Sequence, residues 1–279
     1  MKSVKTFVQE QQKKYVKGWQ NDSNEILNKG LYEWMVAQIN SKHNIILEVG
    51  CGVGNSTLSL LNAGKRVISI DENYYCIEET YKKLIDNGFK VFKINDRLDK
   101  KLDGDFYKTV IKDKKLPDPK IFFEEYECLL LQSDILQDYD LKKFSKLCDV
   151  QTIICWLIGT HSAKAFDSNL GSGIKTPMEY RLKVQNTVYE IADDILKQGG
   201  ILNIIDRGLY LNEQDQQNLI INHKDQASVT ALKVTDKVVQ KKLGLPASNG
   251  VGMVEQNSQD TEIKKSEQEL WLHSVNSYK

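Results

Sequence analysis

The stretch NIILEVGCGVGNS, residues 44–56, decides how this chain folds. It runs from an apolar segment into glycines at every second position, Gly50, Gly52 and Gly54, and ends on Asn55 and Ser56, which can begin a helix. A short apolar run that ends in this way is typical of a buried strand in a parallel sheet. Glycine lets the backbone turn sharply and lets a ligand approach the main chain. The stretch therefore predicts a strand, a ligand-binding turn and a helix in succession.

Strands and helices alternate regularly after this stretch. Further strands are expected at residues 66–70, 128–132, 152–158 and 201–205. Helices are expected at residues 55–61, 74–85 and 179–197. Such alternation indicates βαβ units, and therefore an α/β fold with a doubly wound, mostly parallel sheet and helices on both faces.

Two stretches break this alternation before the tail. Residues 1–43 are expected to form a helical segment of two helices that acts as a lid, with residues 21–24 capping the second helix. Residues 89–127 read as an insertion with possible strands at 90–94 and 106–111. The insertion is either a solvated surface excursion or a cap over a substrate pocket.

The tail has its own pattern within the main domain, which is expected to span residues 44–279. Residues 213–243 look helical. Residues 251–256 and 269–277 are then expected to pair as an antiparallel hairpin, so that residues 251–277 close the edge of the sheet.

Composition limits the classes of protein to which this chain can belong. The chain has 279 residues, 41% of them hydrophobic, which suits one large domain with a sizeable core. Lys and Arg number 38, and so do Asp and Glu, so a binding mode that rests on a global basic field is disfavoured. No apolar run approaches the roughly 18 residues of a membrane span, and the N-terminus lacks the apolar core of a signal peptide. Five scattered cysteines read as free thiols, so a cytoplasmic protein without membrane partners is expected.

Two acidic residues accompany the glycine turn. Glu48 stands two residues before the first glycine, where a carboxylate favours a cationic or amine-bearing ligand over a pyrophosphate. The dinucleotide fingerprint would need glycine at position 55, where Asn55 stands. Asp71 ends the second strand, where an acid is the usual acceptor for both ribose hydroxyls of an adenosine ligand. The alternative is that Asp71 only caps the next helix.

These residues resemble two motifs of the class I S-adenosylmethionine-dependent methyltransferases. The first motif, acid-x-Gly-x-Gly-x-Gly, is matched by residues 48–54, and the second by Ile70 and Asp71. The resemblance spans residues 45–207. It implies a Rossmann-like, seven-stranded sheet with antiparallel sixth and seventh strands, and S-adenosyl-L-methionine bound at the carboxyl ends of the strands.

The resemblance also implies which residues bind this cofactor. Such enzymes carry an acid after the third strand, near the adenine amine, and Asp134 is favoured here, with Asp96 as the alternative. From their positions in the sequence, Tyr15 and Trp19 are candidates for an aromatic lid over the sulfonium, with a helix that docks two aromatic rings on the sheet as the alternative. Trp156 is a candidate for either core or adenine lining. The full predicted set is Tyr15, Trp19, Glu48, Gly50, Cys51, Gly52, Gly54, Asp71, Ser133, Asp134 and Trp156.

The segment after the fourth strand bears on the methyl acceptor. The chain has neither the Pro-Pro turn of amino-methylating DNA enzymes nor the Pro-Cys pair of cytosine-ring enzymes, which argues against DNA. No cluster of acids follows this strand, so no metal is expected. His161 lies there and is the candidate general base, with a turn residue bonded to the backbone as its alternative.

Three functions stay open at this point. The leading one is methyl transfer to a nitrogen or oxygen of a small molecule. One alternative is a methyltransferase that acts on protein or RNA. The other is a binding or scaffold protein that keeps the fold without the chemistry. The oligomeric state is open too, with a homodimer as one possibility.

Overall fold

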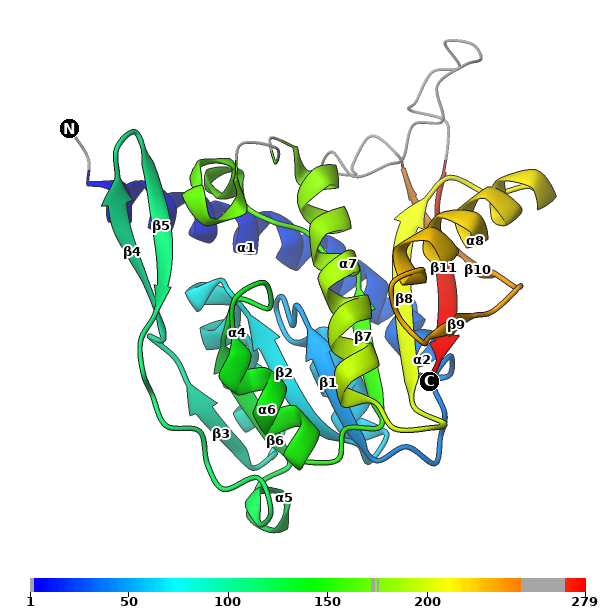
Figure 1. The fold of residues 1–279 in the computed structure, drawn as a ribbon, viewed down its shortest axis with the longest axis horizontal. Helices are drawn as coiled ribbons and strands as arrows, with labels where there is room; N and C mark the ends of the chain where they lie inside the picture. The colour runs from blue at the N-terminus through cyan, green and yellow to red at the C-terminus, as the bar shows by residue number, and fades with distance from the viewer. Residues whose placement is uncertain (1–2, 172–173, 175, 247–268) are drawn as a thin grey trace.

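The computed structural model describes residues 3–171, 174, 176–246 and 269–279, which form a central sheet covered by helices on both faces (Figure 1). The helices are α1 (Val4–Asn28), α2 (Leu31–Val36), α3 (Asn55–Asn62), α4 (Tyr74–Asp86), α5 (Phe122–Glu125), α6 (Tyr139–Leu147), α7 (Pro177–Ile195) and α8 (Glu213–Ala227), with 3₁₀ turns η1 (Ser162–Phe166) and η2 (Ser168–Leu170). The strands are β1 (Ile45–Val49), β2 (Arg66–Asp71), β3 (Val91–Ile94), β4 (Leu98–Asp103), β5 (Phe106–Ile111), β6 (Cys128–Gln132), β7 (Thr152–Trp156), β8 (Ile201–Gly208), β9 (Lys233–Val234), β10 (Val239–Pro246) and β11 (Glu269–Tyr278).

The strand order confirms the predicted doubly wound fold. The main sheet runs β10-β11-β8-β7-β1-β2-β6-β3, and β9 pairs with β11. Strands β3, β6, β2, β1, β7 and β8 are parallel, whereas β11 is antiparallel to β8 and to β10. The sheet has nine strands instead of seven, because β3 adds an outer parallel strand and β9 a short pair on β11.

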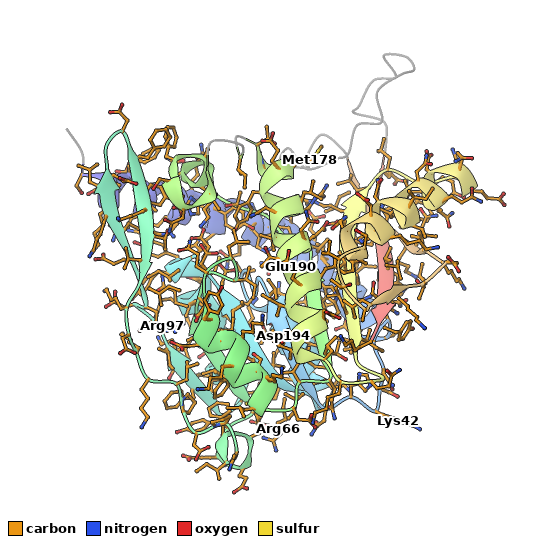
Figure 2. The ribbon with its side chains drawn as sticks, in the orientation of Figure 1. Lys42, Arg66, Arg97, Met178, Glu190 and Asp194 are labelled. Carbon is orange, nitrogen blue, oxygen red and sulfur yellow. The ribbon has the colours of Figure 1, made fainter. Side chains whose placement is uncertain are left out.

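Apolar side chains from the helices fill both faces of this sheet. One buried cluster joins the sheet to α6 and α7, and a second joins it to α1, α2, α3 and α4. Strands β1, β6 and β7 are buried almost throughout, as their unbroken apolar runs predict. On the outer face of α7, Glu190 and Asp194 are exposed (Figure 2).

The N-terminal segment differs from the prediction. We expected two helices with a break at residues 21–24, but α1 continues from Val4 to Asn28. The polar residues that suggested a cap bond to neighbouring elements instead. The Ser23 hydroxyl lies 2.7 Å from the Tyr32 hydroxyl, and the Asn55 amide donates to the Ser23 oxygen at 3.0 Å. The helix ends only before Gly30, whose φ of 66° is left-handed.

The tail also differs from the prediction. The helix predicted to reach residue 243 ends at Ala227, and Val239–Pro246 forms β10. Buried Leu243 and Leu245 alternate with other residues at a period of two, which suits a strand. Strand β11 pairs with β10, and the predicted hairpin strand at residues 251–256 lies outside the described residues.

The insertion contains more structure than the two predicted strands. Strands β3 and β5 lie where they were expected, and β4 pairs with β5 as a separate two-stranded antiparallel sheet. This β4–β5 hairpin packs against α1 and η2, at the N-terminal end of α1 (Figure 1). The hairpin therefore stands beside the carboxyl edge of the main sheet and is more than a solvated excursion.

Candidate functional site

The carboxyl ends of β1, β2, β6 and β7 meet at one edge of the sheet, and two adjoining pockets lie there. The aromatic pocket lies between the glycine turn and α1 and is lined among others by Tyr15, Trp19, Tyr32, Cys51, Ser56 and Trp156. The acidic pocket is lined among others by Asp71, Glu72, Ser133, Asp134, Ile135 and Tyr180. They enclose about 400 and 370 Å³ respectively when the space open to solvent is included. Gly50, Asp71, Ile158 and Gly159 line both pockets. Open α/β sheets bind their ligands at this edge.

Glu48 lies beneath the glycine turn and not in either pocket. Its carboxylate is 2% exposed and accepts hydrogen bonds from the hydroxyls of Ser56, Thr57 at 2.5 Å and Ser69 at 2.6 Å. Burial raises the pKa of Glu48, and the three hydroxyls oppose this shift. Ser56 and Thr57 begin α3, and Ser69 lies on β2. Glu48 therefore holds the turn against its neighbours, whereas the sequence suggested a carboxylate that faces the ligand.

The glycines of the turn leave no room for side chains. Gly50, Gly52 and Gly54 have φ values of 84°, 54° and 81°, which other residues rarely adopt. A Cβ at Gly50 would lie 2.6 Å from Ile158, and one at Gly52 would lie 2.6 Å from the indole nitrogen of Trp19. Gly50 and Gly52 therefore form a cradle of bare backbone at the pockets. Gly54 has a packing role, because its Cβ would meet Thr80 of α4 at 2.9 Å.

Asp71 joins the turn to the end of β2. Its carboxylate accepts the Gly52 amide at 3.0 Å and the Asn73 amide at 2.8 Å. Burial raises the pKa of Asp71 to about 7. The cap of α4 is Asn73, whose side chain accepts the Tyr75 amide at 3.0 Å. Asn73 and not Asp71 is thus the cap of α4, and the Asp71 carboxylate, which accepts two backbone amides, lies where the two pockets meet.

Aromatic residues line the pocket on the α1 side. Tyr15 and Trp19 come from α1, and burial raises the pKa of Tyr15 well above its usual value. Trp156 is both core and pocket lining, with its indole N–H donating to the Asn203 side chain at 2.5 Å. The next residue, Leu157, has a left-handed φ of 53° and ends β7 two residues earlier than predicted.

Two residues near this pocket were not found from the sequence. Tyr32 of α2 lines it. The guanidinium of Arg207, at the end of β8, lies 5.5 Å from the Trp19 ring and forms an ion pair with Asp22 at 2.9 Å. Arg207 is one of only four arginines in the chain. The one sequence signal that could have marked it is its position just after the strand predicted at residues 201–205.

Ser133 and Asp134 line the acidic pocket, as predicted for residues after the strand beside β2. The Asp134 carboxylate accepts the Leu136 amide at 3.1 Å and pairs with the Lys164 amine at 2.9 Å. The alternative residue, Asp96, has an exposed side chain that pairs with Lys112 at 2.9 Å and is absent from the lining of both pockets. The strand beside β2 is β6, which favours Asp134.

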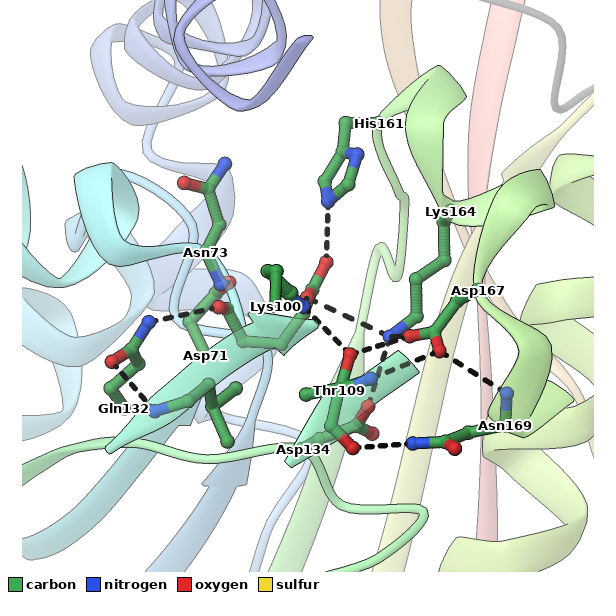
Figure 3. Close-up of polar contacts among 12 residues, drawn as sticks. Asp71, Asn73, Lys100, Thr109, Gln132, Asp134, His161, Lys164, Asp167 and Asn169 are labelled. Carbon is green, nitrogen blue, oxygen red and sulfur yellow. Dashed lines mark hydrogen bonds and ion pairs between the residues drawn. The ribbon is translucent and has the colours of Figure 1, made fainter. Parts of the chain in front are cut away.

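His161 lies behind the acidic pocket and not in its lining. Its Nε2 lies 2.8 Å from Oε1 of Glu72, and the side chain is almost wholly buried (Figure 3). Glu72 does line the pocket. Burial alone would raise the pKa of Glu72, but Lys164 and Lys100, followed by His161, hold it well below its usual value. Neither Glu72 nor Lys164 was singled out from the sequence.

The described residues also bear on metal binding, membrane insertion and thiol reactivity. They contain no group of three or more His, Cys, Asp or Glu side chains placed to hold a metal ion. No helix in the described ranges has the length and apolar character that crossing a membrane requires. The five cysteines are buried and free, and burial raises the pKa of Cys51 well above its usual value, so this pocket thiol stays protonated at neutral pH.

Comparison with known proteins finds a likeness of fold. No family model matches the chain, and no curated protein matches it. Among solved structures, the magnesium protoporphyrin IX methyltransferase ChlM from Synechocystis PCC 6803, with bound S-adenosylhomocysteine, is 10% identical with a TM-score of 0.42, over 92% of this chain and 83% of that one. An rRNA methylase from Streptococcus thermophilus is 14% identical with a TM-score of 0.39, over 87% and 92% of the two chains.

A third structure shows how much of a larger protein the chain spans. Trm5b from Pyrococcus abyssi is 9% identical with a TM-score of 0.44, over 88% of this chain and 47% of that one. The chain therefore spans about half the length of Trm5b. At these identities and TM-scores the likeness concerns the fold alone.

The buried carboxylate beneath the turn gives a first prediction. Glu48→Ala is expected to lower the free energy of unfolding by about 2–4 kcal/mol, because three buried hydroxyls lose their acceptor. Urea unfolding monitored by circular dichroism measures the change. Glu48→Gln keeps the shape and one acceptor oxygen, so it should lose less. An alanine variant as stable as the parent would contradict the supporting role of Glu48.

The raised pKa of Asp71 gives a second prediction. Between the ordinary pKa of 3.8 and the folded value of about 7, the folded chain binds the proton more strongly than the unfolded chain. The contribution of Asp71 to the free energy of unfolding should therefore fall as pH rises from about 4 to about 7. Asp71→Asn should remove that contribution. Urea unfolding of parent and variant across this range tests it, and two parallel pH curves would contradict it.

Proposed function

We propose that the chain is a methyltransferase that binds S-adenosyl-L-methionine across the two pockets. The observation that carries this proposal is the position of the Asp71 carboxylate. It lies at the junction of the pockets, against a turn whose Gly50 and Gly52 line the pockets with backbone alone. An acid in this position suits the two hydroxyls of a ribose, because one carboxylate can accept both.

The residues around Asp71 suit the other parts of the cofactor. The acidic pocket, with Ser133 and Asp134, suits the adenine. The aromatic pocket suits the methionyl part, because the ring faces of Tyr15 and Trp19 attract a sulfonium by roughly 0.5–2 kcal/mol. Arg207, beside Trp19, is our candidate for binding the methionyl carboxylate.

The work of the chain in the reaction is binding and alignment. The cofactor, when bound, supplies an activated methyl group, so a strong base is not required. The residues of the two pockets orient the ligand, and α1, with the β4–β5 hairpin packed against it, contributes Tyr15 and Trp19 to the aromatic pocket. Holding the methyl donor and the acceptor in the reactive geometry accounts for most of the rate enhancement in such transfers.

For the methyl acceptor we favour a nitrogen or oxygen of a small molecule. The aromatic pocket lies beneath α1, and the net charge of the chain is zero, which suits a small ligand better than a nucleic acid. Competition by RNA or by an unfolded protein substrate for binding of S-adenosylhomocysteine would favour the macromolecular alternative.

The role of Asp71 gives a third prediction. Asp71→Ala should weaken binding of S-adenosylhomocysteine by about 2–4 kcal/mol, because the ribose loses a charged acceptor. Isothermal titration calorimetry at pH 8, where Asp71 is ionised, measures the change. Asp86→Ala removes an exposed carboxylate at the end of α4 and is the matched control, with unchanged affinity expected. Equal affinities of the Asp71 variant and the parent would show that the ribose lies elsewhere.

The role of His161 as general base stays a prediction. His161 touches Glu72, which lines the acidic pocket, but does not line a pocket itself, so a proton from the acceptor would have to reach it through Glu72. If His161 takes that proton, His161→Ala should lower kcat by about 10²–10⁴-fold and leave cofactor affinity nearly unchanged. Single-turnover kinetics with an acceptor measures this. A loss below about fivefold would leave His161 as a partner of Glu72 only.

A further inference from the structure

A buried lysine lies among three carboxylates at the acidic pocket. The Lys164 amine is 2.9 Å from the Asp134 carboxylate, 3.1 Å from that of Asp167 and 3.6 Å from that of Glu72 (Figure 3). The side chains of Lys164 and Asp134 are each 1% exposed, and that of Asp167 is not exposed at all. The three acids come from segments far apart in the sequence, so Lys164 joins the ends of β2 and β6 to the turn between η1 and η2.

Two of these three carboxylates face the proposed cofactor site. Glu72 and Asp134 line the acidic pocket, and Glu72 directly follows Asp71. Asp167 is absent from the lining of both pockets. Lys164 therefore touches two pocket-lining residues from behind without lining the pocket itself.

The charges of this cluster depend on one another. Burial alone would lower the pKa of Lys164, but Asp134 and Glu72 raise it well above its usual value. Without the amine, buried carboxylates side by side would repel one another and take up protons. The lysine therefore holds the pKa of Glu72 low, and its contacts fix the direction in which the Glu72 and Asp134 oxygens point.

The β4–β5 hairpin is fastened to the same acids. Lys100 of β4 lies 3.4 Å from the Glu72 carboxylate and 2.8 Å from the Thr109 hydroxyl. Thr109 of β5 in turn donates to Asp167 at 2.7 Å. Through these contacts the insertion reaches the wall of the acidic pocket (Figure 3).

We propose that Lys164 is a positioning residue for the adenosine side of the cofactor site, holding Glu72 and Asp134 in place for the ligand. The proposal rests on the proposed function, since it takes the acidic pocket as the adenosine site. It also gives the insertion a role, because Lys100 contacts the same Glu72 oxygen as Lys164. The expected effect is on every ligand that contains the adenosine part, whatever its methionyl part.

The experiment uses two variants and two probes. Lys164→Met removes the charge, and Lys164→Arg keeps it. Dissociation constants for S-adenosylhomocysteine and 5′-methylthioadenosine, which share adenosine and differ in the methionyl part, are measured by calorimetry well below each variant's melting temperature. Lys65→Met is the matched control, because Lys65 is also buried but donates to the Ser41 and His43 carbonyls at the opposite edge of the sheet.

The results separate positioning from general stability. Lys164→Met should raise the dissociation constants of both probes by about tenfold or more, because the carboxylates that shape the site are no longer held in position. Lys164→Arg should bind both probes more tightly than Lys164→Met, and Lys65→Met should lower the melting temperature without changing either dissociation constant. Unchanged binding by Lys164→Met, weakening of S-adenosylhomocysteine alone, or an arginine variant no better than methionine would each overturn the proposal.

A variant at another lysine, Lys100, covers the case in which Lys164→Met does not fold. Lys100→Met removes the other lysine from Glu72 and should weaken both probes by a smaller factor, of about threefold to fivefold. Unchanged binding there would also overturn the proposal. If the parent protein binds neither probe, the proposed function fails first, and this outcome is distinct from a parent that binds and variants that bind equally well.

Discussion

The carboxylate of Glu48 beneath the glycine turn is the interaction on which the rest of the site depends. It is buried and accepts hydrogen bonds from three hydroxyls, two at the start of α3 and one on β2. These bonds fix where the chain leaves β1 and where α3 begins. The backbone between them is thereby held open as a cradle, with the Gly52 amide directed to Asp71. Because the Glu48 carboxylate supports the turn, a different carboxylate, that of Asp71, is available to the ligand.

The acidic residues at the carboxyl edge of the sheet thus have different roles. Asp71 lies where the pockets meet, while Glu72 and Asp134 line the acidic pocket with Lys164 behind them. Each of these carboxylates has a fixed partner, as buried charges require. The arrangement presents negative charge to a ligand without leaving an isolated buried ion. It also links the insertion to the pocket, since Lys100 contacts Glu72.

Sequence reasoning recovered the parts of this design that have a local pattern. Apolar runs predicted the parallel strands, and Asp71, the acid that ends the second predicted strand, lies at the pockets. It failed where distant contacts override the local pattern: residues 21–24 read as a cap, yet Ser23 bonds to Tyr32 and α1 continues. Residues 239–243 were predicted to end a helix, although they form part of β10, which pairs with β11. The Lys164 cluster had no signal, because its members come from three separate segments of the chain.

The crystal structure of the protein with S-adenosylhomocysteine tests the central claim most directly. Our account predicts both ribose hydroxyls within hydrogen-bonding distance of the Asp71 carboxylate, the adenine in the acidic pocket beside Asp134, and the thioether beside Tyr15 and Trp19. A ligand bound away from the glycine turn would contradict the account. So would a ribose that contacts Glu48 in place of Asp71, because Glu48 would then have to leave the hydroxyls that hold the turn.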